Sequence, residues 1–214
     1  DIIKAAYEKL YAAGYTDKDL ANLRNDPKKL AAVQNAFFEA ASEAGRIHPA
    51  FKNDKQYFFE HLNARYTQES TCPSCAVTNN NGSGIAQLTA PAIQDVWGIV
   101  RNDARTDDTM NVLTGAAFEN KIGVDKNHDD PYSTSLVYKG RNNGEFVYAD
   151  KVEARTNVFS KAFETTLAGG QPTIGFDDRF DSSSRTAAEW RDIVAAQSAY
   201  LVDPAPINNA NGGF

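Results

Sequence analysis

The 214-residue sequence contains few cysteines, few histidines and no cluster of basic residues, and these absences exclude several classes of protein. Its two cysteines, Cys72 and Cys75, cannot form a four-ligand zinc site by themselves, and the three histidines show no metal-ligand spacing. The formal net charge is −6, so the electrostatic footprint of a nucleic-acid-binding protein is missing. We therefore expect no metal, no cofactor and no nucleic-acid partner.

Long hydrophobic runs are also missing. The apolar stretches are far shorter than the roughly 20 residues that span a bilayer, and the negative charge disfavours binding to an anionic membrane surface. The N-terminal segment, residues 1–15, is amphipathic and charged, which is unlike a signal peptide. The first residue is an aspartate, so we interpret the chain as a processed product or as part of a larger polypeptide, and we expect no membrane partner.

Helical periodicity dominates the rest of the sequence. Apolar residues recur at helical spacing, and capping residues and glycines stand at the expected ends of these segments, as with Asp26, Pro27 and Gly45. Helices are predicted over residues 2–13, 17–24, 27–44, 54–69, 89–100, 107–122, 132–139, 145–167 and 186–201. Alternating strand patterns are weak, so we predict an all-α fold that forms a single domain over residues 1–214.

The helix predicted over residues 54–69 has a largely apolar face that ends in a carboxylate. Helical spacing places five side chains on this face: Phe58, Leu62, Arg65, Tyr66 and Glu69. Glu69 is therefore expected to point toward the interior, where desolvation disfavours the charged form of a carboxyl group. A glutamate that stays protonated near neutral pH can act as a general acid. The alternative is a solvated glutamate in a frayed last turn, without a role.

A second helix is predicted to open at Thr89 and to bury a stripe of four residues, Ile93, Val96, Trp97 and Val100. Asp95 falls off this stripe and is expected to face solvent. Near the C-terminus, Thr186 and Glu189 have the spacing of a capping box at a helix start.

Short motifs follow Glu69 at a fixed distance. The pair Glu69-Ser70 is followed, fifteen residues after the glutamate, by "GIAQL" at 84–88, which contains Gln87, and then by "NVLTG" at 111–115. These motifs, in this order and at this spacing, resemble the signature of the lytic transglycosylases with a lysozyme-like fold. Two later tyrosines extend the resemblance to about residue 155: Tyr138 in "VYKGR" and Tyr148 in "YADKV". The match is that of a distant member, because Cys72 and Lys139 depart from the family pattern.

The resemblance implies a lysozyme-like helical domain with a groove for a peptidoglycan glycan strand. Glu69 would protonate the glycosidic oxygen between N-acetylmuramic acid and N-acetylglucosamine, and would then accept the proton of the muramyl C6 hydroxyl as a 1,6-anhydro ring closes. One carboxyl group suffices because the nucleophile is intramolecular. Ser70, Gln87, Tyr138 and Tyr148 would bind substrate or stand close to the glutamate.

Two other functions remain open. A hydrolytic muramidase on the same scaffold would need a second carboxylate, for which Asp107, Asp108 and Asp129 are the candidates. A non-catalytic helical module that binds glycan, or that forms part of an assembly, is the other alternative. A peptidoglycan-cleaving enzyme would act outside the cytoplasm, in a phage particle, in the periplasm or after secretion.

Two further features have ordinary interpretations. "CPSC" at 72–75 is compatible with a local disulfide that stiffens the polar loop, or with two unlinked thiols. "DKNHDDPYSTSL" at 125–136 begins like a calcium-binding loop but lacks the required glycine and glutamate, which favours a solvated acidic loop.

Overall fold

The helices begin where a capping side chain meets a helical apolar pattern, as helix α3 (Pro27–Glu43) illustrates. The carboxylate of Asp26 accepts hydrogen bonds from two backbone N–H groups of the first turn, and proline occupies the first helical position, where no amide proton is needed. The chain leaves the helix at Gly45, whose φ of 66° is in the left-handed region. Both ends are those that the sequence predicts.

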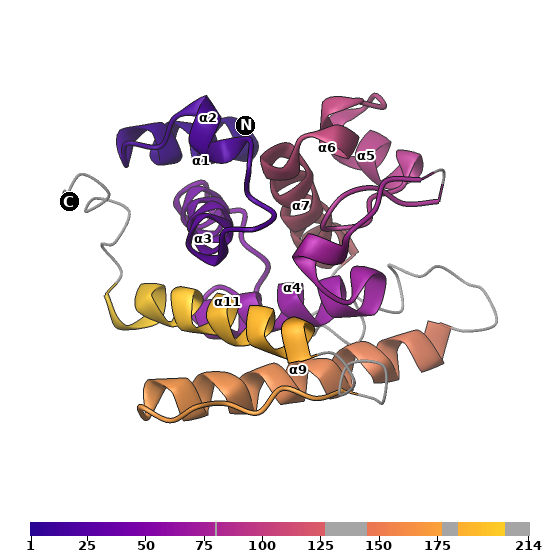
Figure 1. Ribbon diagram of the computed structural model, residues 1–214. Coiled ribbons are helices and arrows are strands. Elements are labelled where there is room, and N and C mark those ends of the chain that lie inside the picture. The colour runs from indigo at the N-terminus through magenta and orange to yellow at the C-terminus, as the bar shows by residue number, and fades with distance from the viewer. Residues whose placement is uncertain (80, 127–144, 177–183, 204–214) are drawn as a thin grey trace.

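The computed structural model describes residues 1–79, 81–126, 145–176 and 184–203 (Figure 1). Within these ranges the chain forms helices and no strand, which confirms the predicted all-α class. The remaining elements are α1 (Ile2–Ala12), α2 (Asp17–Leu20), α4 (Lys55–Ser70), the 3-10 turn η1 (Pro73–Cys75), α5 (Ala90–Trp97), α6 (Asp103–Thr106), α7 (Asp108–Lys126), α9 (Glu145–Leu167) and α11 (Ser184–Val202).

Helix α4 lies between two groups of helices. It contacts α9 and α11 on one side, which run along the lower edge of Figure 1, and α3 on another. Helix α7 contacts α3, α5, α6 and α1. Every residue of α4 from Phe58 to Thr67 is buried, so the helix is enclosed on all sides. The prediction of one buried face was correct for Phe58, Leu62, Arg65 and Tyr66 but too narrow, and its last member, Glu69, is only half-buried.

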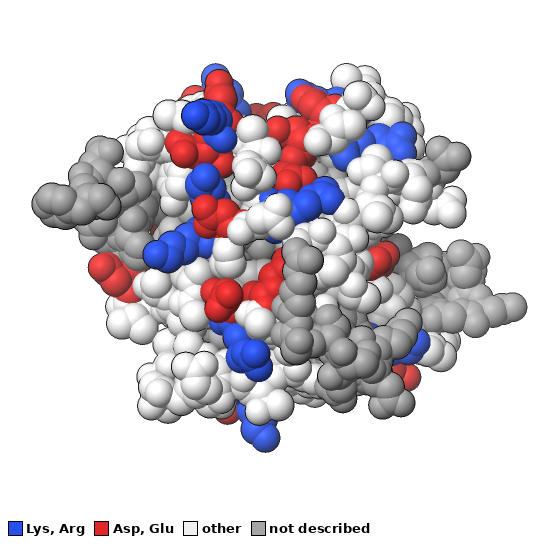
Figure 2. All heavy atoms as spheres, in the orientation of Figure 1, with Lys and Arg blue, Asp and Glu red and all other residues white. Residues whose placement is uncertain are grey.

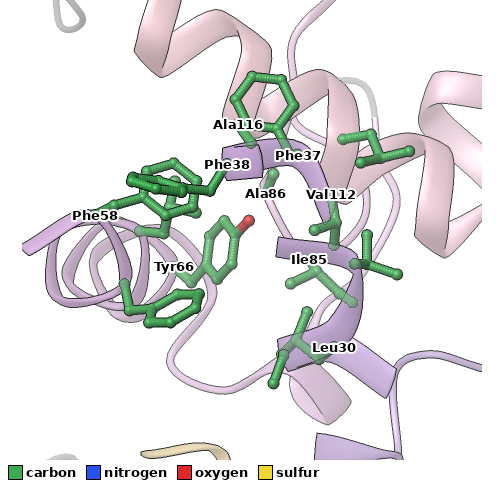
Figure 3. Packing of buried hydrophobic residues seen from close by; sticks show 14 of the residues in the cluster. Leu30, Phe37, Phe38, Phe58, Tyr66, Ile85, Ala86, Val112 and Ala116 are labelled. Carbon is green, nitrogen blue, oxygen red and sulfur yellow. The ribbon is translucent and has the colours of Figure 1, made fainter. Parts of the chain in front are cut away.

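The hydrophobic core joins α3 and α4 to a loop and to α7 (Figure 3). The rings of Phe37 and Phe58 stack with centroids 6.2 Å apart. Tyr66 of α4 is 1% exposed and lies near Ile85 and Ala86 of the loop, as Figure 3 shows. The loop that follows α4 is thus part of the core and not a surface excursion.

Three local predictions were wrong. Val100 is exposed, because α5 ends at Trp97 and Gly98 takes a left-handed φ of 73°. The predicted capping box is not at a helix start, because α11 begins at Ser184, and Glu189 instead accepts hydrogen bonds from another segment. The helix predicted over residues 17–24 is shorter, ending at Leu20. The helix predicted over 132–139 lies outside the described residues.

Charges of both signs are interspersed on the face shown in Figure 2. Among the described residues, several lysine and acidic side chains form ion pairs between helices, such as Lys9 with Glu43 at 2.6 Å and Lys55 with Glu39 at 3.7 Å. None of the helices in the described ranges combines the length and the hydropathy that crossing a bilayer requires.

Candidate active site

Glu69 stands in the last turn of α4 with a half-buried side chain. The hydroxyl of Tyr148, near the start of α9, donates a hydrogen bond to Glu69 Oε1. Tyr148 itself is only 7% exposed. The two residues are 79 positions apart, and their contact forms where the C-terminal end of α4 meets the N-terminal part of α9.

Behind Tyr148 lies a buried charged group that connects α4 to α7. The guanidinium carbon of Arg65 lies 5.2 Å from the centroid of the Tyr148 ring, within the range of a cation–π contact. The same guanidinium pairs with Glu119, with Nε 2.6 Å from Oε1 and Nη2 3.1 Å from Oε2. His61 Nε2 lies 3.1 Å from Glu119 Oε2. We call Arg65, Glu119 and His61 the buried triad.

The protonation states of the buried triad follow from burial and mutual attraction. Burial alone would raise the pKa of Glu119, but the Arg65 charge and the hydrogen bond from His61 outweigh it and lower this pKa to about 2. Burial lowers the pKa of His61 below its ordinary value. Because ionised Glu119 can only accept, neutral His61 must donate from Nε2.

The loop predicted to carry Gln87 is tied to the end of α4. Ser70 Oγ donates to the carbonyl oxygens of Tyr66 at 3.2 Å and Ile85 at 3.3 Å, so the residue after Glu69 anchors the loop. Gln87 has a positive φ of 47°, and its Nε2 donates to the carbonyls of Val77 and Gly84, both at 2.7 Å. The Gln87 amide therefore closes the loop on itself.

The third motif holds the same loop from the side of α7. Asn111 is fully buried; its Oδ1 accepts from the Ala86 N–H at 2.8 Å, and its Nδ2 donates to the carbonyls of Ser83 and Ala104, both at 2.9 Å. One turn later, Gly115 leaves room for the Ala86 methyl group, because a Cβ at residue 115 would lie 2.6 Å from it. The first and third motifs that were singled out in the sequence thus both contact the second, the 84–88 loop.

The turn after Ser70 is braced on both sides. Cys72 and Cys75 form a disulfide, which decides between the two interpretations of "CPSC". Thr71 has a φ of 64°, an uncommon value for a β-branched residue, and its carbonyl accepts a hydrogen bond from the buried Trp190 indole at 2.8 Å. Ser74 donates to both carboxylate oxygens of Glu189, at 2.9 and 2.6 Å.

The carboxylates considered as a second acid have other partners where the structure describes them. Asp107 Oδ1 accepts from the Met110 N–H at 2.7 Å, and burial raises the pKa of this carboxyl above its ordinary value. Asp108 pairs with Arg24 at 3.1 Å. Asp129 lies outside the described residues, and so does Tyr138.

Asp95 is exposed, as predicted, and lies 3.5 Å from Lys121. Within the described part of the chain, no group of three or more histidine, cysteine or carboxylate side chains could hold a metal ion. A hollow of about 260 Å³ lies beside the disulfide turn, lined by Ser74, Glu189 and the start of α3, and Glu69 does not line it.

Sequence reasoning missed the buried triad. Glu119 and His61 are 58 residues apart, and neither occurs in a recognisable motif. The one available signal was Arg65, a charged residue at a position of the apolar face of α4, which required a buried partner.

Comparison with known proteins adds no further evidence. No protein-family model matches the chain, and searches of curated proteins and of solved structures gave no significant match. A function must therefore be argued from the side chains.

Proposed function

We propose that this protein cleaves peptidoglycan as a lytic transglycosylase, with Glu69 as its acid and base. The observation that carries the proposal is the half-buried Glu69 carboxyl group, which receives a hydrogen bond from Tyr148 at the end of a helix fixed by its surroundings. The contacts of Ser70, Asn111 and Gly115 with the 84–88 loop support it, because they give each motif of the resemblance a physical task.

The chemistry requires one carboxyl group used twice. Protonated Glu69 donates its proton to the oxygen between N-acetylmuramic acid and N-acetylglucosamine, and the bond from muramyl C1 to that oxygen breaks. The C6 hydroxyl oxygen of the same muramic acid then bonds to C1 and releases its proton to the Glu69 carboxylate. The Tyr148 hydroxyl, donating to Oε1, stabilises the carboxylate between these two steps.

The choice of a lyase over a hydrolase is supported by the partners of the other carboxylates. Retaining and inverting glycosidases place a second carboxyl group about 5–10 Å from the first. Of the three candidates, the two that the structure describes have structural partners, since Asp107 accepts from a backbone amide and Asp108 pairs with Arg24. An intramolecular hydroxyl needs no such base, since its effective concentration is high.

The proposal includes the fold and the compartment. The helical arrangement around α4 would be a lysozyme-like domain, with the glycan strand bound where Glu69 meets α9. The disulfide between Cys72 and Cys75 favours an oxidising compartment, such as the periplasm, the exterior of the cell or the surface of a phage particle. Peptidoglycan is accessible in each of these.

The test combines a peptidoglycan gel with mass spectrometry of the products. The wild-type protein should clear the gel and release muropeptides that end in 1,6-anhydromuramic acid. Glu69→Gln should lower the rate roughly 10²–10⁴-fold while the protein stays folded. Glu8→Gln, at an exposed glutamate of α1, is the matched control and should leave the rate unchanged.

Other outcomes would overturn parts of the proposal. Products with reducing muramic acid ends, one water heavier, would show that the enzyme is a hydrolase with a second carboxylate. A folded wild-type protein that binds peptidoglycan but leaves no clearing would show a non-catalytic module. Near-normal clearing by Glu69→Gln would exclude Glu69 as the acid.

A further inference from the structure

A chain of described contacts links the buried triad to the candidate acid through the ring of Tyr148. His61 donates to Glu119, Glu119 pairs with Arg65, Arg65 lies against the Tyr148 ring, and the Tyr148 hydroxyl donates to Glu69. The path runs from α4 to α7, back to α4, on to α9 and finally to the end of α4. It ends at the one carboxylate that the proposed function requires.

We propose that Arg65 and Glu119 are positioning residues, which act on Glu69 by fixing the orientation of the Tyr148 ring and hydroxyl. This inference rests on the proposed function for its catalytic consequence, but its structural core is the contact chain itself. A tyrosine at the start of a helix can turn about its side-chain bonds. A planar guanidinium against the ring, itself held by both carboxylate oxygens of Glu119, restricts that rotation.

The choice of a buried arginine and a buried glutamate supports a role in orienting Tyr148 rather than in stabilising the fold. Arg65 and Glu119 are 2% and 3% exposed, so both charges have lost nearly all contact with water. A buried ion pair is a weak source of stability, because the cost of desolvation offsets the attraction between the charges. The pair instead restrains the orientation of the guanidinium, because Nη2 donates a hydrogen bond to Glu119 Oε2 and Nε lies 2.6 Å from Oε1 as an ion pair. A guanidinium restrained in this way can hold the Tyr148 ring in one orientation.

The consequence for Glu69 is that its two carboxyl oxygens take different roles, because Oε1 accepts the hydrogen bond from Tyr148. With Tyr148 donating to Oε1, the carboxyl group is restrained at one oxygen, and Oε2 would carry the transferable proton. Loss of the orientation would let Glu69 sample other rotamers. Turnover would fall because fewer encounters present the proton to the glycosidic oxygen, whereas substrate binding would change little.

The first experiment is a double-mutant cycle on kcat with Arg65→Lys and Tyr148→Phe. Lysine keeps the charge toward Glu119 but lacks the planar fork, and phenylalanine keeps the ring but lacks the hydroxyl. Each single variant should lower kcat about tenfold with KM nearly unchanged, and the double variant should also be lowered only about tenfold. Effects that multiply to about a hundredfold would overturn the proposal, because Arg65 would then act independently of the Tyr148 hydroxyl.

A matched control separates positioning from general destabilisation. Thr109→Val removes a buried polar contact of α7 elsewhere, the hydrogen bond that the Thr109 hydroxyl donates to the Leu20 carbonyl at 2.8 Å, and should leave kcat within about twofold of wild type at a temperature where all variants are folded. If it lowers kcat as much as Arg65→Lys does, the effect of Arg65 is structural only, and the proposal fails. If Arg65→Lys does not fold, Glu119→Gln replaces it, since it preserves shape and releases the guanidinium.

The second experiment needs no enzymatic activity. Tyrosines labelled with ¹³C at Cζ give one NMR signal per ring, and Tyr148→Phe identifies one of the nine tyrosine signals as that of Tyr148. Glu69→Ala should move this signal by removing the acceptor, and Arg65→Lys should move it in the same direction. A Tyr148 signal that stays in place in folded Arg65→Lys would overturn the positioning role. If wild-type protein does not cleave peptidoglycan, the proposed function fails, and this experiment still decides whether Arg65 orients Tyr148.

Discussion

Replacement of Gly115 by alanine tests how the 84–88 loop packs against α7, because two opposing effects meet at this position. An alanine in a helix interior is about 1 kcal/mol more favourable than a glycine, which would stabilise α7. The added methyl group, however, would lie 2.6 Å from the Ala86 methyl, far inside ordinary van der Waals contact. Overpacking of this kind costs about 1–3 kcal/mol. The net expectation is a loss of about 1 kcal/mol, or a fall in Tm of about 2–4 °C.

The compensating variant makes the argument specific. Ala86→Gly removes the opposing methyl group, so Gly115→Ala should become stabilising in that background, with a coupling energy of about 1–3 kcal/mol in a double-mutant cycle. Thermal unfolding followed by circular dichroism measures all four proteins. If Gly115→Ala raises Tm equally in both backgrounds, residues 86 and 115 do not touch, and the packing of the motifs is wrong.

Three further predictions concern neighbouring parts of the molecule. Burial raises the pKa of Glu60 from its ordinary value of 4.5 to about 7, so the folded state keeps a proton that the unfolded state releases, and stability should fall as pH rises from about 4.5 to 7. Urea unfolding should show Glu60→Gln more stable than wild type by about 1–3 kcal/mol at pH 8 and equal to it at pH 4, and an unchanged pH profile would contradict this. Replacing Cys72 and Cys75 by serine should cost about 2 kcal/mol, seen as a lower Tm, yet leave the products of any cleavage unchanged; complete loss of turnover in the folded variant would reopen a chemical role for the cysteines. Asn111→Ala should cost about 2–4 kcal/mol in the same urea assay, because it removes the side-chain partner of the Ala86 N–H and of the Ala104 and Ser83 carbonyls, of which Ser83 keeps only the Leu88 N–H, and a cost below about 1 kcal/mol would contradict these bonds.

Much of the fold could be predicted because its signals are local. The caps and apolar periods of α3 and α9 gave their ends closely, and the buried face of α4 was identified down to Tyr66. Of the predictions that failed, one has a local cause and another has a contact distant in sequence as its cause. Val100 has the right spacing for a buried stripe, but the left-handed Gly98 ends α5 before it. Glu189 has the spacing of a capping residue, but its carboxylate accepts hydrogen bonds from Ser74, which is 115 residues away in sequence.

The candidate site was only partly predictable, because its contacts join segments that are distant in sequence. Glu69 could be singled out because it ends a helical stripe, and Ser70 and Gln87 because they belong to motifs at a fixed distance. Their observed contacts are with the loop backbone, a detail that spacing cannot give. Glu119 gave no signal at all, since a buried ion pair depends on which helices pack together and not on neighbours in sequence.

Helix α4 combines an apolar environment with directional bonds, and this combination explains how one end of it can hold a reactive group. Apolar contacts are non-directional, so a helix enclosed only by apolar side chains could turn or slide by small amounts at low cost. The amide of Asn63 bonds to Gln197 of α11, and the guanidinium of Arg65 bonds to Glu119 of α7. These bonds oppose rotation from two different sides. Because Glu69 follows Arg65 by one helical turn, a rotation of α4 about its axis that displaced the carboxylate would also strain the buried ion pair.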